Sequence, residues 1–129
     1  MASWEDVSRI ALELPQAVEQ TKREQRRWLV KDRLFVWERP LRPKEIEALR
    51  SDIHEGPILA ARVEHLGAEQ ALLAEDPHVF FTTPHFERTA AILLRLDRIS
   101  PEDLDEVIVE AWLARAPKRL VQGYLGQNA

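Results

Sequence analysis

The sequence predicts an α+β fold in which an antiparallel five-stranded sheet has helices packed on one face. Two observations support this. The expected element order is helix, three strands, helix, two strands, helix, which lacks the regular strand–helix–strand units of a parallel α/β fold. The 129 residues fit one domain that is long enough to bury a core. We therefore expect residues 1–129 to form a single domain.

The first helix is predicted from its cap and its periodicity. Ser3 can cap a free N–H, and Asp6 supplies a short variant of the capping-box acid. Pro15 disfavours the α conformation of the residue before it and stops the helix. Helical spacing is shown by the apolar residues Trp4, Val7, Ile10, Ala11 and Leu14.

Two β-prone runs, 26–30 and 33–38, surround Lys31 and Asp32. This arrangement predicts a hairpin, although its turn lacks the glycine of the best two-residue turns. Residues 17–21, just before it, fit either a short strand or an extended arm.

The middle of the chain alternates between loops and short elements. Residues 39–56 are interpreted as a surface insertion, and strand 58–63 follows. A short helix over 67–75 precedes strands 79–82 and 90–96. The last of these is nearly all apolar, which is typical of a central strand with both faces covered.

The final helix has the clearest pattern. Ser100 caps it and Pro101 suits its first turn. Pro117 breaks or restarts the helix, residues 120–125 add a final turn, and residues 126–129 form a frayed tail. One apolar stripe consists of Leu104, Val107, Ile108, Ala111 and Trp112.

Charge and composition narrow the function classes. Eighteen Lys and Arg against 22 Asp and Glu give a net charge of −4, which counts against strong non-specific nucleic-acid binding. The absence of cysteine excludes disulfides, thiol nucleophiles and thiolate metal sites. There is no long apolar run and no signal-peptide pattern at the N-terminus. We expect a cytoplasmic protein with no membrane partner.

Metal and cofactor binding are not expected. The four histidines, at positions 54, 65, 78 and 85, are far apart and form no H-x-x-x-H pair. Walker, G-x-G-x-x-G and G-x-S-x-G motifs are absent as well. The sequence therefore predicts no cofactor and no metal site, and no catalytic residue is assigned from it.

Three runs, 72–86, 93–98 and 111–120, together with the proline-terminated first helix, resemble the MmcQ/YjbR-like family. The resemblance spans residues 4–120. It implies a small α+β domain with an antiparallel sheet and helices on one side. It also implies DNA binding, from the double-wing arrangement proposed for that family. The sequence departs from the family at residues 87–90, where relatives carry a Gly-aromatic element, and in the longer segment 39–56.

The segment from Thr21 to Arg33 is locally basic, with six cations against two acids. Trp28 and Phe35 interleave with these charges. One interpretation is a hairpin that contacts DNA phosphates; the other is a solvated strand face whose arginines pair with acidic neighbours. The candidate nucleic-acid contacts are Lys22, Arg23, Arg26, Arg27, Lys31 and Arg33.

A second candidate site follows strand 79–82. Its members Thr82, Thr83, His85 and Arg88 fit a pocket for a small anionic ligand or an enzymatic site. They fit equally a local turn in which His85 bonds a backbone carbonyl.

Two further cations near Trp112 complete the set of candidate ligand-binding residues. Lys118 and Arg119 fit either an anion site or a helix C-terminus whose carbonyls they satisfy. Trp112 itself is expected in the core.

The leading functional hypothesis is a non-enzymatic DNA-binding module that uses the basic hairpin. The first alternative is a small-ligand or enzymatic pocket around Thr82, Thr83 and His85. The second is a protein-interaction domain with an exposed sheet face that carries Trp28, Phe35 or Trp37.

Overall fold

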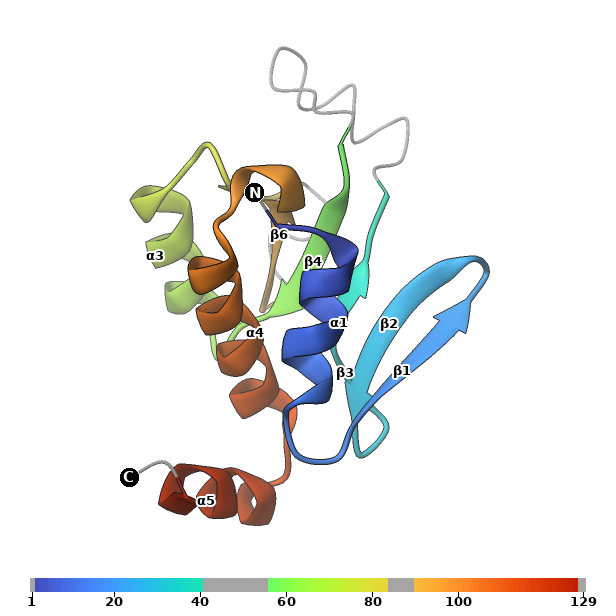
Figure 1. The fold of residues 1–129 in the computed structure, drawn as a ribbon. Helices are drawn as coiled ribbons and strands as arrows, with labels where there is room; N and C mark the ends of the chain where they lie inside the picture. Colours follow the sequence, from blue (N-terminus) through green and yellow to red (C-terminus); the bar gives the residue numbers. More distant parts are fainter. Residues whose placement is uncertain (1, 41–55, 84–89, 128–129) are drawn as a thin grey trace.

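The computed structural model of the protein describes residues 2–40, 56–83 and 90–127. It has an α+β fold built on one antiparallel sheet of six strands in the order β1-β2-β3-β4-β6-β5 (Figure 1). The strands are β1 (Ala17–Lys22), β2 (Gln25–Val30), β3 (Arg33–Glu38), β4 (Ile58–Arg62), β5 (Phe80–Phe81) and β6 (Ala91–Arg95). The helices are α1 (Trp4–Leu12), α3 (Leu66–Glu75), α4 (Pro101–Arg115) and α5 (Lys118–Gln127), with a 3₁₀ turn, η2, at Leu96–Arg98.

The sequence predicted five strands and three helices. The described residues form six strands and four helices, so one strand and one helix were missed. The additional strand is β1, whose residues after Ala17 are all exposed. A strand with no buried face gives no alternation of apolar and polar residues, so periodicity does not reveal it.

The additional helix is α5. Pro117 ends one helix and its carbonyl accepts from Val121 N–H in the next, because a proline is tolerated where a helix begins. Helix α5 continues to Gln127, so Gly126 and Gln127 are helical and not part of a frayed tail.

The helices cover one face of the sheet. Helix α4 packs on β3 and β4, α1 packs on α4 and β1, and α3 lies against β5 and β6 (Figure 1). The core between helices and sheet is built around Trp28, Phe35 and Trp112, all fully buried. Trp112 donates its indole N–H to Pro15 O at 3.1 Å, which confirms its predicted place in the core.

The opposite face of the sheet is also apolar at its centre. A second cluster contains Ile58, Ala60, Phe81, Ala91 and Leu93, with Trp37 packed against it. Strand β6 lies between β4 and β5, and all of its residues are buried. The prediction of a central strand covered on both faces is therefore confirmed.

The hairpin at Lys31 and Asp32 is confirmed, and a second hairpin joins β1 to β2 through Arg23 and Glu24. All four turn residues have positive φ angles, between 49° and 66°. Two consecutive left-handed residues define the type I′ turn that matches the twist of a two-residue hairpin. Of the predicted surface insertion, residues 41–55 lie outside the described residues.

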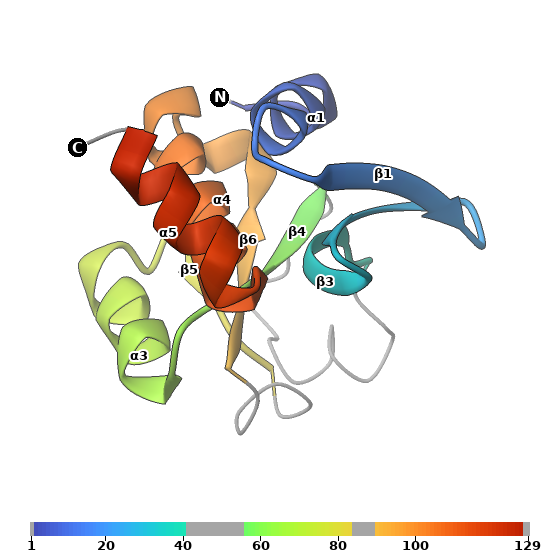
Figure 2. The same cartoon turned by 90° about the horizontal axis from the view of Figure 1, so that it is seen from below.

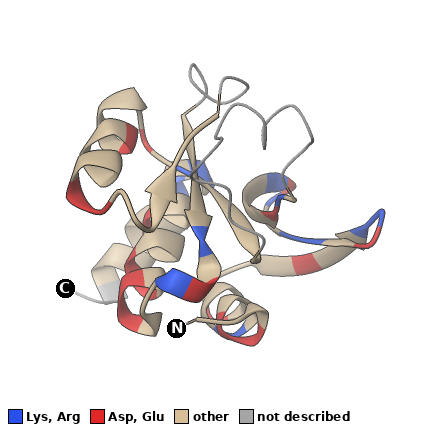
Figure 3. Ribbon diagram, turned by 90° about the horizontal axis from the view of Figure 1, so that it is seen from above, with Lys and Arg blue, Asp and Glu red and all other residues tan. Residues whose placement is uncertain are grey.

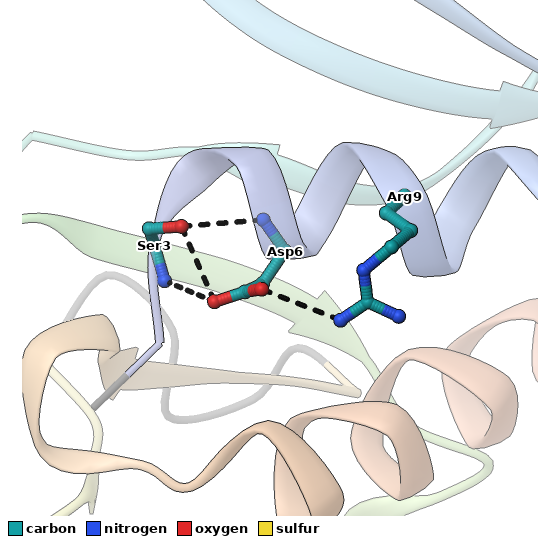
Figure 4. A network of polar contacts seen from close by, with 3 residues as sticks. All are labelled: Ser3, Asp6 and Arg9. Atoms are coloured by element: carbon teal, nitrogen blue, oxygen red, sulfur yellow. Dashed lines mark hydrogen bonds and ion pairs between the residues drawn. The ribbon is translucent and has the colours of Figure 1, made fainter.

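The N-terminal capping box is present (Figure 4). Ser3 Oγ accepts from Asp6 N–H, and Asp6 Oδ2 accepts from Ser3 N–H at 2.9 Å. Arg9 Nη2 pairs with Asp6 Oδ1 at 3.3 Å. The Ser3 backbone hydrogen bond, and then Arg9, lower the pKa of the Asp6 carboxyl below its ordinary value of 3.8.

One residue on β1 joins this outer strand to its neighbours. The carboxylate of Glu19 on β1 accepts from Trp28 Nε1 at 2.8 Å and from Ser8 Oγ at 2.5 Å. These bonds connect β1 to β2 and to α1.

We predict that Asp6→Asn lowers the melting temperature at pH 7, and that its difference from the wild type shrinks as the pH falls below 3.8. A depressed folded-state pKa stabilises above the ordinary pKa and is lost as the pH falls through the folded value. Thermal unfolding followed by circular dichroism at pH 7 and pH 2.5 measures both differences. Asp105→Asn, an exposed acid in α4, is the control; a pH-independent difference for Asp6→Asn would contradict the prediction.

We predict that Glu19→Ala lowers the free energy of unfolding by about 1–3 kcal/mol, because the Trp28 N–H loses its partner in a partly buried position. Urea unfolding measures it. The neighbouring exposed residue supplies the matched control, since Gln20→Ala should stay within about 0.5 kcal/mol of the wild type. Equal stability of the two variants would contradict the assigned role of Glu19.

Candidate nucleic-acid interface

The β1–β2 hairpin forms an arm that projects from the body of the molecule. Figures 1 and 2 show it extending away from the helices, with only its base close to α1. At its tip, Arg23 and Glu24 have φ angles of 53° and 66°. Left-handed backbone costs a non-glycine residue roughly 1–2 kcal/mol, and such strain is concentrated at functional sites. The tip therefore holds two charged side chains where glycine or asparagine would be less strained.

A hollow of about 260 Å³ lies between this arm and β3. Four of the six predicted nucleic-acid contacts line it. The carboxylate of Glu38, also in the lining, accepts from Arg26 N–H at 3.1 Å, so this acid is bonded to the backbone of the arm. The complete lining is Lys22, Arg23, Gln25, Arg26, Arg27, Leu34, Trp37 and Glu38.

The other two predicted contacts lie elsewhere. Lys31 is in the turn at the far end of β2. Arg33 donates to Arg115 O at 3.3 Å and lines a groove of about 840 Å³ along α4 and α5 together with Lys118. The structure therefore divides the basic segment between two places, because the chain reverses at both ends of β2.

The four cations of the hollow form no ion pair with an acidic side chain in the described part of the chain. Among the described residues, an ion pair joins Arg9 to Asp6 at 3.3 Å. Both residues are on α1, remote from the arm. The interpretation that the arginines pair with acidic neighbours is not supported for Arg26 and Arg27. Four cations against the single carboxylate of Glu38 in the lining raise the local positive potential.

Two of the three predicted surface aromatics are in the core. Trp28 and Phe35 are both 0% exposed, so they contribute neither to a basic wing nor to an exposed interaction face. The register of β2 against β3 shifts between Trp28 and Leu29, and this irregularity leaves Phe35 and Val36 in the same core. Trp37 is half-buried and lines the hollow; it remains as the aromatic of this face.

The register of the sheet places another cation beside Trp37. Trp37 pairs with Ala60 on β4, and Arg62 is two residues further along the same face. The Arg62 guanidinium lies 5.5 Å from the centre of the Trp37 ring. Arg62 was not predicted as a site residue from the sequence. The pattern that could have indicated it is a single arginine near the end of the apolar run 58–63.

Arg62 is partly buried and lies close enough to Arg115 to be affected by its positive charge. Burial, and then the charge of Arg115, lower the pKa of the Arg62 guanidinium below its usual value. Because an arginine stays protonated in proteins, Arg62 keeps its charge at neutral pH. It therefore adds to the positive potential beside the hollow.

The second candidate site is only partly described. Thr82 lines a separate hollow of about 190 Å³ with Leu66, Glu69, Gln70 and Leu73, and Thr83 is 2% exposed. His85 and Arg88 lie outside the described residues.

One interpretation placed Lys118 and Arg119 at the C-terminus of a helix. They lie instead in the first turn of α5. Helix α4 ends at Arg115, before Pro117, so Lys118 and Arg119 lie outside its last turn. Because Lys118 lines the α4–α5 groove and Thr82 lines a hollow beside α3, the predicted ligand-binding residues do not share one cavity.

Charge is divided between the helices and the arm. Helix α4 carries five acidic residues and one basic residue, whereas residues 22–27 carry four basic residues and one acidic residue. Figure 3 shows acidic segments on the helices, and both signs at the tip of the outer hairpin. The protein is therefore acidic overall but basic on one projection.

The described residues contain neither a metal-binding group nor a helix that could span a membrane. In the described ranges, no three His, Asp or Glu side chains form a group suited to a metal ion. None of the helices described is at once long enough and apolar enough to cross a bilayer.

The chain is similar to proteins whose roles are not defined. No family model matches it. It is 46% identical to the uncharacterised proteins Rv2570 and MT2646 of Mycobacterium tuberculosis and Mb2600 of Mycobacterium bovis, over 99% of each chain. The crystal structure of Deinococcus radiodurans protein DR2400, a DUF419 domain, superposes with a TM-score of 0.65 at 18% identity, covering 88% of this chain and 78% of that one. The structural similarity supports the fold, and the sequence identity shows that the chain belongs to the family of these mycobacterial proteins.

Proposed function

We propose that this protein is an MmcQ/YjbR-like, non-enzymatic DNA-binding module of the cytoplasm that holds phosphates with its outer hairpin. The observation that carries the proposal is the hollow at the arm, which four cations line without an ion pair to any described residue. The six-stranded antiparallel sheet with helices on one face agrees with the fold that the family resemblance implies.

The lining favours binding over catalysis. It has a single carboxylate, that of Glu38, whose Oε1 accepts from the Arg26 N–H. It contains no histidine, serine or threonine that could act as base or nucleophile. Guanidinium groups, by contrast, match phosphate oxygens in geometry and charge.

The overall charge of −4 is compatible with this role because the charges are separated. The acidic helix α4 repels a polyanion and the basic arm attracts it, so the field orients the molecule with the arm toward the nucleic acid. Contacts of this kind depend on phosphates and not on base sequence. They should produce weak, salt-sensitive binding.

We predict that Arg26→Ala/Arg27→Ala weakens DNA binding by about tenfold or more at 50 mM salt and reduces the slope of log K against log salt by about two. The slope falls because each lost phosphate contact releases fewer counterions. Fluorescence anisotropy with a labelled oligonucleotide at four salt concentrations measures both quantities.

A matched variant with the same change in net charge is Arg9→Ala/Arg119→Ala, on α1 and α5. It should leave the slope within about 0.5 of the wild type, because neither residue lines the hollow. Unchanged affinity and slope in the hairpin variant, or equal losses in both variants, would refute the proposal.

A further inference from the structure

We propose that the hollow selects single-stranded over duplex nucleic acid, with one base stacked on Trp37 and Arg62 positioning that ring. The inference rests on the proposed function and specifies its ligand class. It depends on three features: the size of the hollow, the aromatic in its lining, and the cation over that aromatic.

The size of the hollow limits what can enter it. A volume of about 260 Å³ is below the roughly 300–1,000 Å³ of pockets that hold a whole drug-sized ligand. One base, or one phosphate with part of its sugar, is of suitable size. In a duplex the bases are stacked inside a stiff rod and cannot enter, whereas a single strand can turn a base outward.

The lining combines the two chemistries that single strands require. Lys22, Arg23 and Arg26 supply cations for the backbone, and Trp37 supplies an aromatic surface in the same hollow. Arg27 is directly opposite Trp37 in the β2–β3 ladder, so charge and ring lie side by side on one face. Aromatic side chains interleaved with cations bind bases without sequence preference, because every base has a π-face.

Arg62 is suited to hold the ring in place. Its guanidinium is 5.5 Å from the ring centre, within the range of a cation–π contact. Its Nε is shielded from water and has no hydrogen-bond partner within the described ranges. Arg62 is absent from the lining of the hollow, and we assign it a positioning role.

The test compares three 12-mer probes, dT12, rU12 and a 12-base-pair DNA duplex, by fluorescence anisotropy with the full chain. We expect the wild type to bind at least one single strand about tenfold or more tightly than the duplex. The ratio of the dT12 and rU12 affinities then identifies the preferred sugar.

Two variants test the residues. Trp37→Ala should weaken single-strand binding by about tenfold and duplex binding by less than about twofold, with Trp37→Phe recovering part of the loss. Arg62→Gln should weaken single-strand binding by about two- to fivefold, and Arg62→Lys should restore most of it. Arg9→Gln, on α1, is the matched control and should change neither affinity.

The possible outcomes separate this inference from the proposed function. Equal wild-type affinity for strand and duplex, or equal losses on both probes in Trp37→Phe and Arg62→Gln, would overturn the selection for single strands and leave DNA binding standing. No binding of any probe by the wild type would overturn both proposals. Trp37→Phe and Arg62→Gln keep the test decisive if Trp37→Ala does not fold.

Discussion

The arm depends on the carboxylate of Glu19, which anchors an edge strand that has little packing of its own. Strand β1 buries no side chain completely, so its side chains contribute little hydrophobic stabilisation. Glu19 bonds it to Trp28 in the core and to Ser8 on α1. Because Trp28 is fully buried, these bonds fix the point at which the hairpin leaves the body, and with it the hollow against β3.

The second organising feature is the separation of charge by layer. Helix α4 carries five acidic residues and one basic residue, while the arm carries four cations that form no ion pair with a described carboxylate. Exposed charges are largely screened beyond the Debye length, which is about 8 Å at physiological salt. The net charge of −4 for the whole chain therefore says little about the potential that a phosphate meets at the hollow. The local potential at the hollow decides binding.

Most of the fold was predictable because its signals are local: the caps at Ser3 and Ser100, the apolar run of β6 and the turn at Lys31. The basic cluster was equally visible in the sequence. The faces of the aromatics were not predictable, because a bulge in β3 leaves the consecutive residues Phe35 and Val36 both in the same core. The contact of Trp37 with Arg62 was not predictable either, because it depends on strand register. In the second candidate site, His85 lies outside the described residues.

The most direct test of the central claim, that the hollow beside the arm is the binding surface, is a titration of the ¹⁵N-labelled protein with dT12 followed by NMR. The chain has four tryptophans, and Trp28 and Trp112 donate their indole N–H groups inside the protein. Binding of dT12 at the hollow should shift the amide signals of residues 22–27 and the Trp37 indole signal, and it should leave the α4 and α5 amide signals unchanged. Shifts confined to α4 and α5, or no shifts at all, would contradict it.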